Sequence, residues 1–165
     1  RSPDGAIEHR EYLHKDTSNP LPSLIRSLKE NVEASGSILV WSESYEKKRN
    51  NEMAESYPDE AEFLTTFNER VIDLMKPFTQ DMVRDPAFMG SSSIKKVLPA
   101  MVPDFSYEGL GIQEGSAATR KWQEATFGET SAGECKKIYN DLVQYCQLDT
   151  MAMVEIYKKL LELST

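Results

Sequence analysis

The sequence lacks an apolar run of about 18 residues or more, and it lacks a basic-then-apolar N-terminal segment. These absences argue against a membrane span and a secretory signal, so we expect a cytoplasmic protein. Cysteine is scarce, because Cys135 and Cys146 are the only two and neither belongs to a CxxC pair. Both fall in a region expected to be helical, which favours packed thiols over a disulfide or a zinc site. A Walker loop, a dinucleotide-binding fingerprint and a hydrolase nucleophile elbow are also missing.

Basic residues are fewer than acidic ones. The chain has 19 Lys and Arg against 27 Asp and Glu, a net charge of −8. This balance argues against a broad basic surface for nucleic acid. It does not exclude a metal-dependent nuclease, which needs clustered acids at its centre and only a local basic strip. The candidate strips are residues 47–49 and the pair Lys95 and Lys96, although each is equally typical of a solvated helix face.

The order of the predicted elements indicates an α/β protein. The 165 residues, 39% of them hydrophobic, suit a single domain over residues 1–165, and no internal repeat interrupts them. An amphipathic helical stripe, a glycine turn and a short β-branched run form the usual order of elements in an α/β protein. We expect an edge strand over 6–14, helices over 21–32 and 45–57, a strand buried on both faces over 37–41, a helix from Pro58 leading to a strand over 71–75, and helices over 94–101, 117–127 and 134–163.

Asp149 interrupts an apolar stripe in the last predicted helix. The stripe recurs at steps of three and four residues and consists of Ile138, Leu142, Tyr145, Asp149, Ala152, Ile156 and Leu160. Burying an ionised carboxylate without a partner is costly, so a metal, a cation or hydrogen-bond donors should lie opposite it. Tyr145 precedes Asp149 by four residues and shares its face. The alternative is that the helix breaks near Leu148 and Asp149 caps a new one.

Two further segments carry side chains suited to chemistry. Glu43 and Glu46 follow the strand expected at 37–41, and ligand sites of α/β sheets lie beyond the carboxyl ends of strands. Their alternative role is to favour a helix N-terminus through its dipole. The serine run ahead of Lys95 and Lys96 leaves amide donors and hydroxyls near two cations, which suits a phosphate, but it is equally an ordinary serine cap.

Taken in chain order, these pieces resemble the DEDD superfamily of 3′–5′ exonucleases, and within it an uncharacterised bacterial family. The most specific element is the Tyr-x-x-x-Asp arrangement of Tyr145 and Asp149. Glu46, after Tyr45, takes the place where the superfamily has an aspartate behind an aromatic residue. The resemblance rests on residues 38–41 leading into 44–46, then 71–74, 90–99, 102–107 and 145–150.

The resemblance implies a ribonuclease H-like mixed sheet flanked by helices. It also implies two Mg²⁺ or Mn²⁺ ions about 3.5–4 Å apart, acting on the end of single-stranded DNA or RNA. Asp149 and Glu46 would be metal ligands and Tyr145 would orient the attacking water. From their chemistry alone, Ser92, Lys95 and Lys96 are expected near the nucleic-acid backbone.

The first superfamily motif, an Asp-x-Glu on the central strand, is absent. By the same resemblance, residues 6–14 look like the third strand of the superfamily sheet. We therefore expect the chain to lack the first strands of the sheet and two of four metal ligands. An upstream segment, a partner chain or altered packing must then fill the gap. The rival hypothesis is a non-catalytic interaction or structural domain that keeps this fold, and a weaker one is a mostly helical acidic adaptor.

Overall fold

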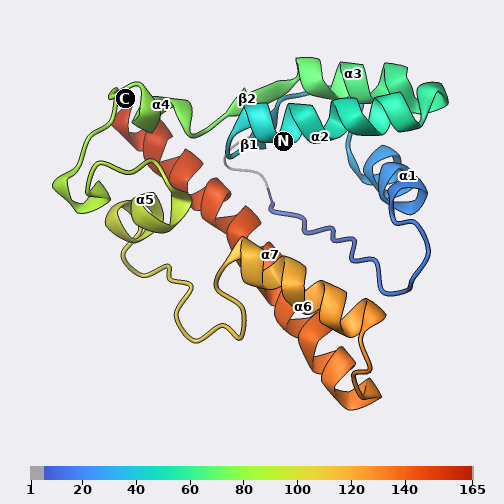
Figure 1. The fold of residues 1–165 in the computed structure, drawn as a ribbon. Coiled ribbons are helices and arrows are strands. Elements are labelled where there is room, and N and C mark those ends of the chain that lie inside the picture. Colours follow the sequence, from blue (N-terminus) through green and yellow to red (C-terminus); the bar gives the residue numbers. More distant parts are fainter. Residues whose placement is uncertain (1–5, 165) are drawn as a thin grey trace.

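The structure is a computed structural model that describes residues 6–164. It is an α/β arrangement, mostly helical, with one small sheet (Figure 1). Its elements are α1 (Leu21–Asn31), β1 (Ile38–Val40), α2 (Glu43–Ser56), the 3₁₀ turn η1 (Pro58–Glu60), α3 (Ala61–Glu69), β2 (Val71–Asp73), α4 (Lys76–Thr79), the 3₁₀ turn η2 (Pro86–Phe88), α5 (Ile94–Met101), α6 (Gly115–Phe127) and α7 (Ala132–Leu163). Both strands and all the principal helices therefore fall where the sequence pattern predicts them.

The sheet has two parallel strands. β1 pairs with β2 in a register that sets Ile38 opposite Val71 and Val40 opposite Asp73. The crossover between them runs through α2, η1 and α3, as a parallel pair requires. Among residues 6–164 the second edge of β1 pairs with nothing, and all three of its residues are only half-buried. The expectation that β1 is buried on both faces is wrong, because every one of its side chains, on either face, keeps part of its surface in solvent.

The predicted edge strand over residues 6–14 is also wrong. The segment has no regular secondary structure and pairs with neither strand. It crosses the middle of the molecule between α2–α3 and the α6–α7 pair (Figure 1). The Trp122 indole donates to the carbonyl of His14 at 2.7 Å, and Leu13 packs against the cluster shared by α6 and α7. A strand needs a partner for its hydrogen-bond ladder, and no strand of the described residues adjoins this segment.

The buried apolar residues form three separate clusters. The first joins α4, η2, α5 and the C-terminal half of α7, the second joins α6 to the N-terminal half of α7, and the third joins α1, α2 and α3. Tyr107, between α5 and α6, packs against both the first and the second cluster. The long helix α7 thus connects two of the three clusters.

Helix α7 is continuous through Asp149, so the alternative of a break near Leu148 is wrong. At its start the Ser131 side chain caps the helix by accepting from the Glu134 amide, and it also donates to the Glu134 carboxylate. The predicted stripe is buried at Ile138, Leu142, Tyr145, Ala152 and Ile156. Neither α7 nor any other helix within residues 6–164 is both long and apolar enough to cross a membrane.

Candidate functional site

Asp149 has a hydrogen-bond donor opposite it, one of the three partners that the sequence predicts. The hydroxyl of Tyr107 donates to Asp149 Oδ1 at 2.7 Å. Asp149 is half-buried on α7, whereas Tyr107 belongs to the irregular segment between α5 and α6. Sequence analysis assigns no role to Tyr107, because a loop residue lies outside any helical or strand period.

Tyr145 lies beside this pair. It is 9% exposed, and its ring centroid is 6.2 Å from that of Tyr107. Burial and the nearby charge of Asp149 raise the pKa of Tyr145 to about 12. Burial, and next the hydrogen bond to Asp149, raise the pKa of Tyr107 far above its usual range. Both hydroxyls therefore stay protonated at neutral pH, and that of Tyr107 donates to Asp149.

Lys95 adjoins the same group. Its Nζ donates to the carbonyl of Gln113 at 2.5 Å and lies 5.9 Å from the centroid of the Tyr107 ring. A cation at this distance is attracted by the ring face. The structure thus brings Lys95 to Tyr107, which in turn contacts Asp149.

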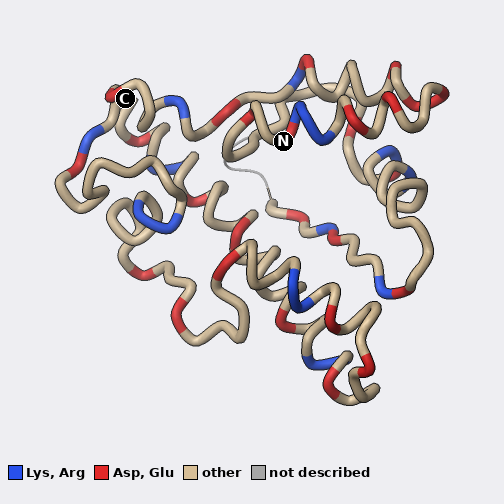
Figure 2. Tube along the Cα trace, in the orientation of Figure 1, with Lys and Arg blue, Asp and Glu red and all other residues tan. Residues whose placement is uncertain are grey.

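The other two residues predicted to approach nucleic acid lie apart from this group. Lys96 is exposed on α5. The Ser92 carbonyl accepts from the Trp41 indole at 3.2 Å, and Ser92 borders a cavity of about 690 Å³. Figure 2 shows the basic residues as short segments interspersed with acidic ones. Binding of nucleic acid by these residues stays a prediction.

Glu46 occupies a different environment. It lines a cavity of about 630 Å³ between α1, α2 and β1, whose apolar lining includes Leu21, Leu24 and Val40. The carboxyl is half-buried and forms no hydrogen bond or ion pair with residues 6–164, and burial raises its pKa. Asp149 does not line this cavity. Among the described residues Glu46 is therefore a carboxylate without a hydrogen-bond or ion-pair partner, and it does not belong to the Tyr107–Asp149 pair.

Asp73, at the end of β2, is a buried acid to which the sequence analysis gave no role. Its Oδ1 accepts the amides of Ser42 at 3.0 Å and Met75 at 2.8 Å, and its Oδ2 accepts the amide of Glu43 at 3.0 Å. The side chain thus caps the start of α2 across the sheet and stabilises Ser42 at a left-handed φ of 78°. An acid directly after two apolar strand residues is the signal that could have identified it.

Glu43 is also held by protein groups. Its carboxylate forms ion pairs with Lys76 at 2.5 Å and Lys47 at 3.2 Å. The hydrogen bond from Lys76, and then that from Lys47, hold the pKa of Glu43 below its usual value. Glu43 and Asp73 therefore stabilise the carboxyl end of the sheet through contacts within the fold.

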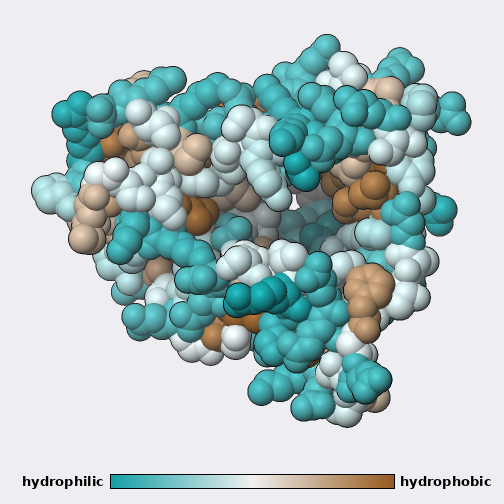
Figure 3. Space-filling model, in the orientation of Figure 1, coloured by the Kyte–Doolittle hydropathy of each residue, from teal (hydrophilic) through white to brown (hydrophobic). Residues whose placement is uncertain are grey.

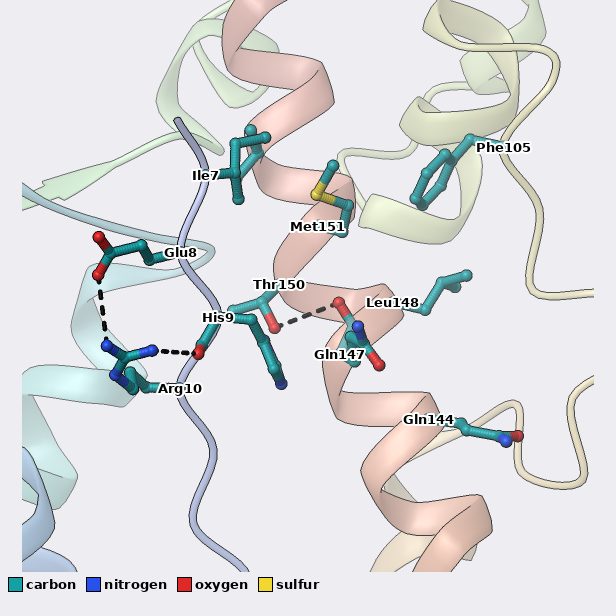
Figure 4. A pocket seen from close by; sticks show the side chains of 11 residues that line it. Ile7, Glu8, His9, Arg10, Phe105, Gln144, Gln147, Leu148, Thr150 and Met151 are labelled. Carbon is teal, nitrogen blue, oxygen red and sulfur yellow. Dashed lines mark hydrogen bonds and ion pairs between the residues drawn. The ribbon is translucent and has the colours of Figure 1, made fainter. Parts of the chain in front are cut away.

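A hollow opens in the middle of the face shown in Figure 3. Beside α7 a cavity of about 590 Å³ separates the helix from residues 7–10. Ile7 and His9 point toward α7, whereas Glu8 and Arg10 point away, an alternation typical of extended chain (Figure 4). Ile7 is 54% exposed. The apolar side chains that line this cavity are Ile7, Phe105, Leu148, Met151 and Val154.

The described residues do not by themselves fit a two-ion site. Residues 6–164 contain no group of three or more His, Cys, Asp or Glu side chains arranged to hold a metal. Asp149 and Glu46 each offer the carboxylate oxygens that Mg²⁺ and Mn²⁺ prefer. Each therefore suits a single ligand position, and a complete set requires carboxylates from elsewhere.

A comparison with known protein families assigns the chain to one of them. Residues 1–93 match the family described as a domain of unknown function, DUF2779. The chain belongs to this family. This DUF2779 chain is 28% identical over 149 residues to the uncharacterized protein MG366 of Mycoplasma genitalium, covering 84% of the chain and 22% of that protein. It is 30% identical over 132 residues to the MG366 homolog of Mycoplasma pneumoniae, covering 73% of the chain and 20% of that protein.

The DUF2779 chain thus spans about a fifth of the length of these curated relatives. No solved structure matches it.

Proposed function

We propose that this chain is the C-terminal part of a metal-dependent 3′–5′ exonuclease-like domain. Its ribonuclease H-like sheet would be completed by strands from outside these 165 residues. The observation that carries the proposal is the free edge of β1, which among residues 6–164 pairs with β2 on one side and with no strand on the other. Such an edge is a ready template for another strand.

Two of the cavities fit the same proposal. One exposes Val40 of β1 together with Leu21 and Leu24 of α1, and the other exposes Ile7 and Met151. Strands laid between them would remove these apolar groups from water, at about 25 cal/mol per Å² of apolar area. A two-stranded sheet is marginal alone and gains stability from added strands. The longer relatives have ample length to supply such strands.

The metal site would be assembled from both parts. Asp149 and Glu46 would each provide one carboxylate, and the completing strands would provide two more for Mg²⁺ or Mn²⁺. Tyr145, which shares the helix face of Asp149, would orient the attacking water. The substrate would be the 3′ end of single-stranded DNA or RNA, met in the cytoplasm, with Ser92, Lys95 and Lys96 near its backbone.

The test is Mn²⁺-dependent shortening of a 5′-labelled single-stranded oligonucleotide by the protein that carries this chain, expressed at its natural length. We expect stepwise loss from the 3′ end, and its abolition by Asp149→Asn. Glu155→Gln is the matched control, because it also converts an acid of α7 to its amide, and Glu155 pairs only with the neighbouring Lys158 at 2.8 Å among the contacts described. An inactive parent, or an Asp149→Asn variant as active as the parent, would contradict the proposal.

A second candidate function is a non-catalytic interaction domain that keeps the same fold. The observation that favours it is the hydrogen bond from Tyr107, which gives the Asp149 carboxylate a partner without any metal. Mn²⁺ binding separates the two candidates, because a catalytic site should bind the ion and lose it in Asp149→Asn.

A further inference from the structure

We infer that Glu46 forms an ion pair with a lysine of a segment outside these 165 residues, and that this segment docks as a strand on the free edge of β1. The inference rests on the second candidate function, in which the same fold binds no metal, and it names the chemistry of the segment that completes the sheet. Three observations carry it: an unpaired carboxylate, an apolar cavity around that carboxylate, and an unpaired strand edge beside the cavity.

Glu46 is the one charged side chain of its cavity that has no partner among the described residues. The other two charged residues of the lining, Arg49 and Glu52, pair with each other at 2.8 Å. The buried amide of Asn50 is also engaged, because it donates to the Asn68 side chain at 2.8 Å. The cavity therefore carries one net negative charge, and a half-buried carboxylate of this kind is stabilised by one positive charge placed opposite it.

The elements around Glu46 contribute apolar side chains to the same cavity. Helix α1 supplies three leucines, β1 supplies Val40 and α3 supplies Phe67. A lysine fits this lining, because its apolar stem packs against such side chains while its ammonium reaches the carboxylate. An arginine leaves more N–H donors unsatisfied beside a single carboxylate, since it has five donors where lysine has three. Without carboxylates from elsewhere a divalent ion has too few ligands here, whereas one ammonium needs only this acceptor.

The free edge of β1 adjoins the cavity through Val40. The Ile38 amide donates to the Arg70 carbonyl, and the Val40 carbonyl accepts from the Leu74 amide, each at 2.9 Å, so Ile38 and Val40 face β2. Successive residues of a strand direct their backbone groups to opposite edges, and the amide and carbonyl of Leu39 therefore face the free edge. A strand added there bonds to Leu39 and sets its side chains over the cavity, a mode in which the main chain gives affinity and the pocket gives specificity.

The docking segment belongs to the same protein. The chain spans about a fifth of the length of its curated relatives, so most of such a protein lies outside these residues. A segment linked covalently to its site has a high effective concentration there, and it docks without the full cost of bringing two molecules together.

Carbodiimide cross-linking of the natural-length protein tests the ion pair. The reagent activates a carboxylate, an amine in contact with it then forms an amide bond, and the carboxylate oxygen leaves with the reagent as a urea. With a chelator present, mass spectrometry of proteolytic peptides should show Glu46 joined to a lysine outside these 165 residues. Glu46→Gln should lose this cross-link. Glu55→Gln is the matched control and should keep it, because Glu55 is an exposed acid of α2 that does not line the cavity.

Hydrogen exchange followed by mass spectrometry tests the docking on β1. The Leu39 amide should exchange slowly in the natural-length parent, since a docked strand accepts its hydrogen bond. In Glu46→Gln it should exchange about tenfold faster, because the segment loses a charge pair that holds it in place. Glu55→Gln should exchange as the parent does.

The outcomes separate the ion pair from the proposals on which the sheet depends. If Glu46 of the parent carries no cross-link, or is joined only to lysines within the 165 residues, the inference is overturned. A protected Leu39 amide in that case shows a completed sheet without the lysine. A cross-link that Mn²⁺ abolishes assigns Glu46 to the metal and overturns the inference in favour of the catalytic proposal. A cross-link that persists in Mn²⁺ supports the inference and removes Glu46 from the metal site.

Discussion

Replacing Asp73 with alanine should cause a large loss of stability. The Asp73 side chain is 8% exposed and accepts three backbone amides, those of Ser42, Glu43 and Met75. Alanine removes all three acceptors at once. It leaves the start of α2 and the turn after β2 without their partners.

The size of the loss follows from the number of bonds. Each amide left unsatisfied in a buried place costs about 1–3 kcal/mol, so three amides set a range of about 3–9 kcal/mol. Ser42 and Glu43 are only half-buried, and water that reaches them brings the expected loss to about 3–5 kcal/mol. Since a whole domain is stable by about 5–15 kcal/mol, this one substitution removes a large share.

The assay is urea unfolding followed by circular dichroism, and Asp85→Ala is the control. Asp85 is exposed and caps the 3₁₀ turn η2 through a single bond to the Ala87 amide at 2.7 Å. Its loss should cost about 0.5–1 kcal/mol. If Asp73→Ala lowers the free energy of unfolding by no more than Asp85→Ala, the interpretation of Asp73 as a three-amide cap is refuted.

Three other predictions concern titration and backbone packing. The pKa of Tyr145 is raised from 10.0 to about 12 in the folded chain, so this tyrosine's contribution to stability is complete below pH 10 and is lost as pH rises through 12. The free energy of unfolding should therefore fall less between pH 10 and pH 12 in Tyr145→Phe than in the parent, and an equal fall would contradict this. Burial raises the pKa of Glu46 above 4.5, so its ionised form opposes folding at neutral pH. In metal-free buffer Glu46→Gln should therefore raise the melting temperature at pH 7, and this gain should vanish below pH 4.5. Gly128→Ala would place its Cβ 2.5 Å from the Glu124 carbonyl oxygen and should cost about 1–3 kcal/mol. Gly133→Ala meets open space within α7 and should gain about 0.5–1 kcal/mol by the same urea assay; similar values for the two glycines would count against the packing argument.

The sequence predicted the helices well because their signal is local. The apolar stripe that includes Ile138, Leu142 and Ile156 repeats over the full length of α7, and all three residues are buried. The same stripe identified Asp149 as an acid that needs a partner. Spacing along one helix fixes which residues share a face, so Tyr145 could be assigned to the face of Asp149.

The partner itself could not be predicted. Tyr107 lies 42 positions before Asp149, in a segment without periodicity, and only the packing of α5, α6 and α7 brings its hydroxyl to the carboxylate. Asp73 likewise finds its three donors only because β1 and β2 pair in one particular register. Contacts of this kind depend on where separate elements dock, which no local pattern encodes.

In the N-terminal segment, too, the sequence predicts the local conformation but not the contacts between elements. The composition of residues 6–14 permits an extended chain, and the alternation of Ile7 and His9 against Glu8 and Arg10 is present in the structure. Whether an extended chain becomes a strand depends on a neighbour that accepts its backbone hydrogen bonds, and within residues 6–164 none lies beside it. The sequence by itself therefore determined the local conformations and the helix faces. Tertiary structure alone decided which strands pair and which donor holds Asp149, because these depend on hydrogen bonds between residues far apart in the chain.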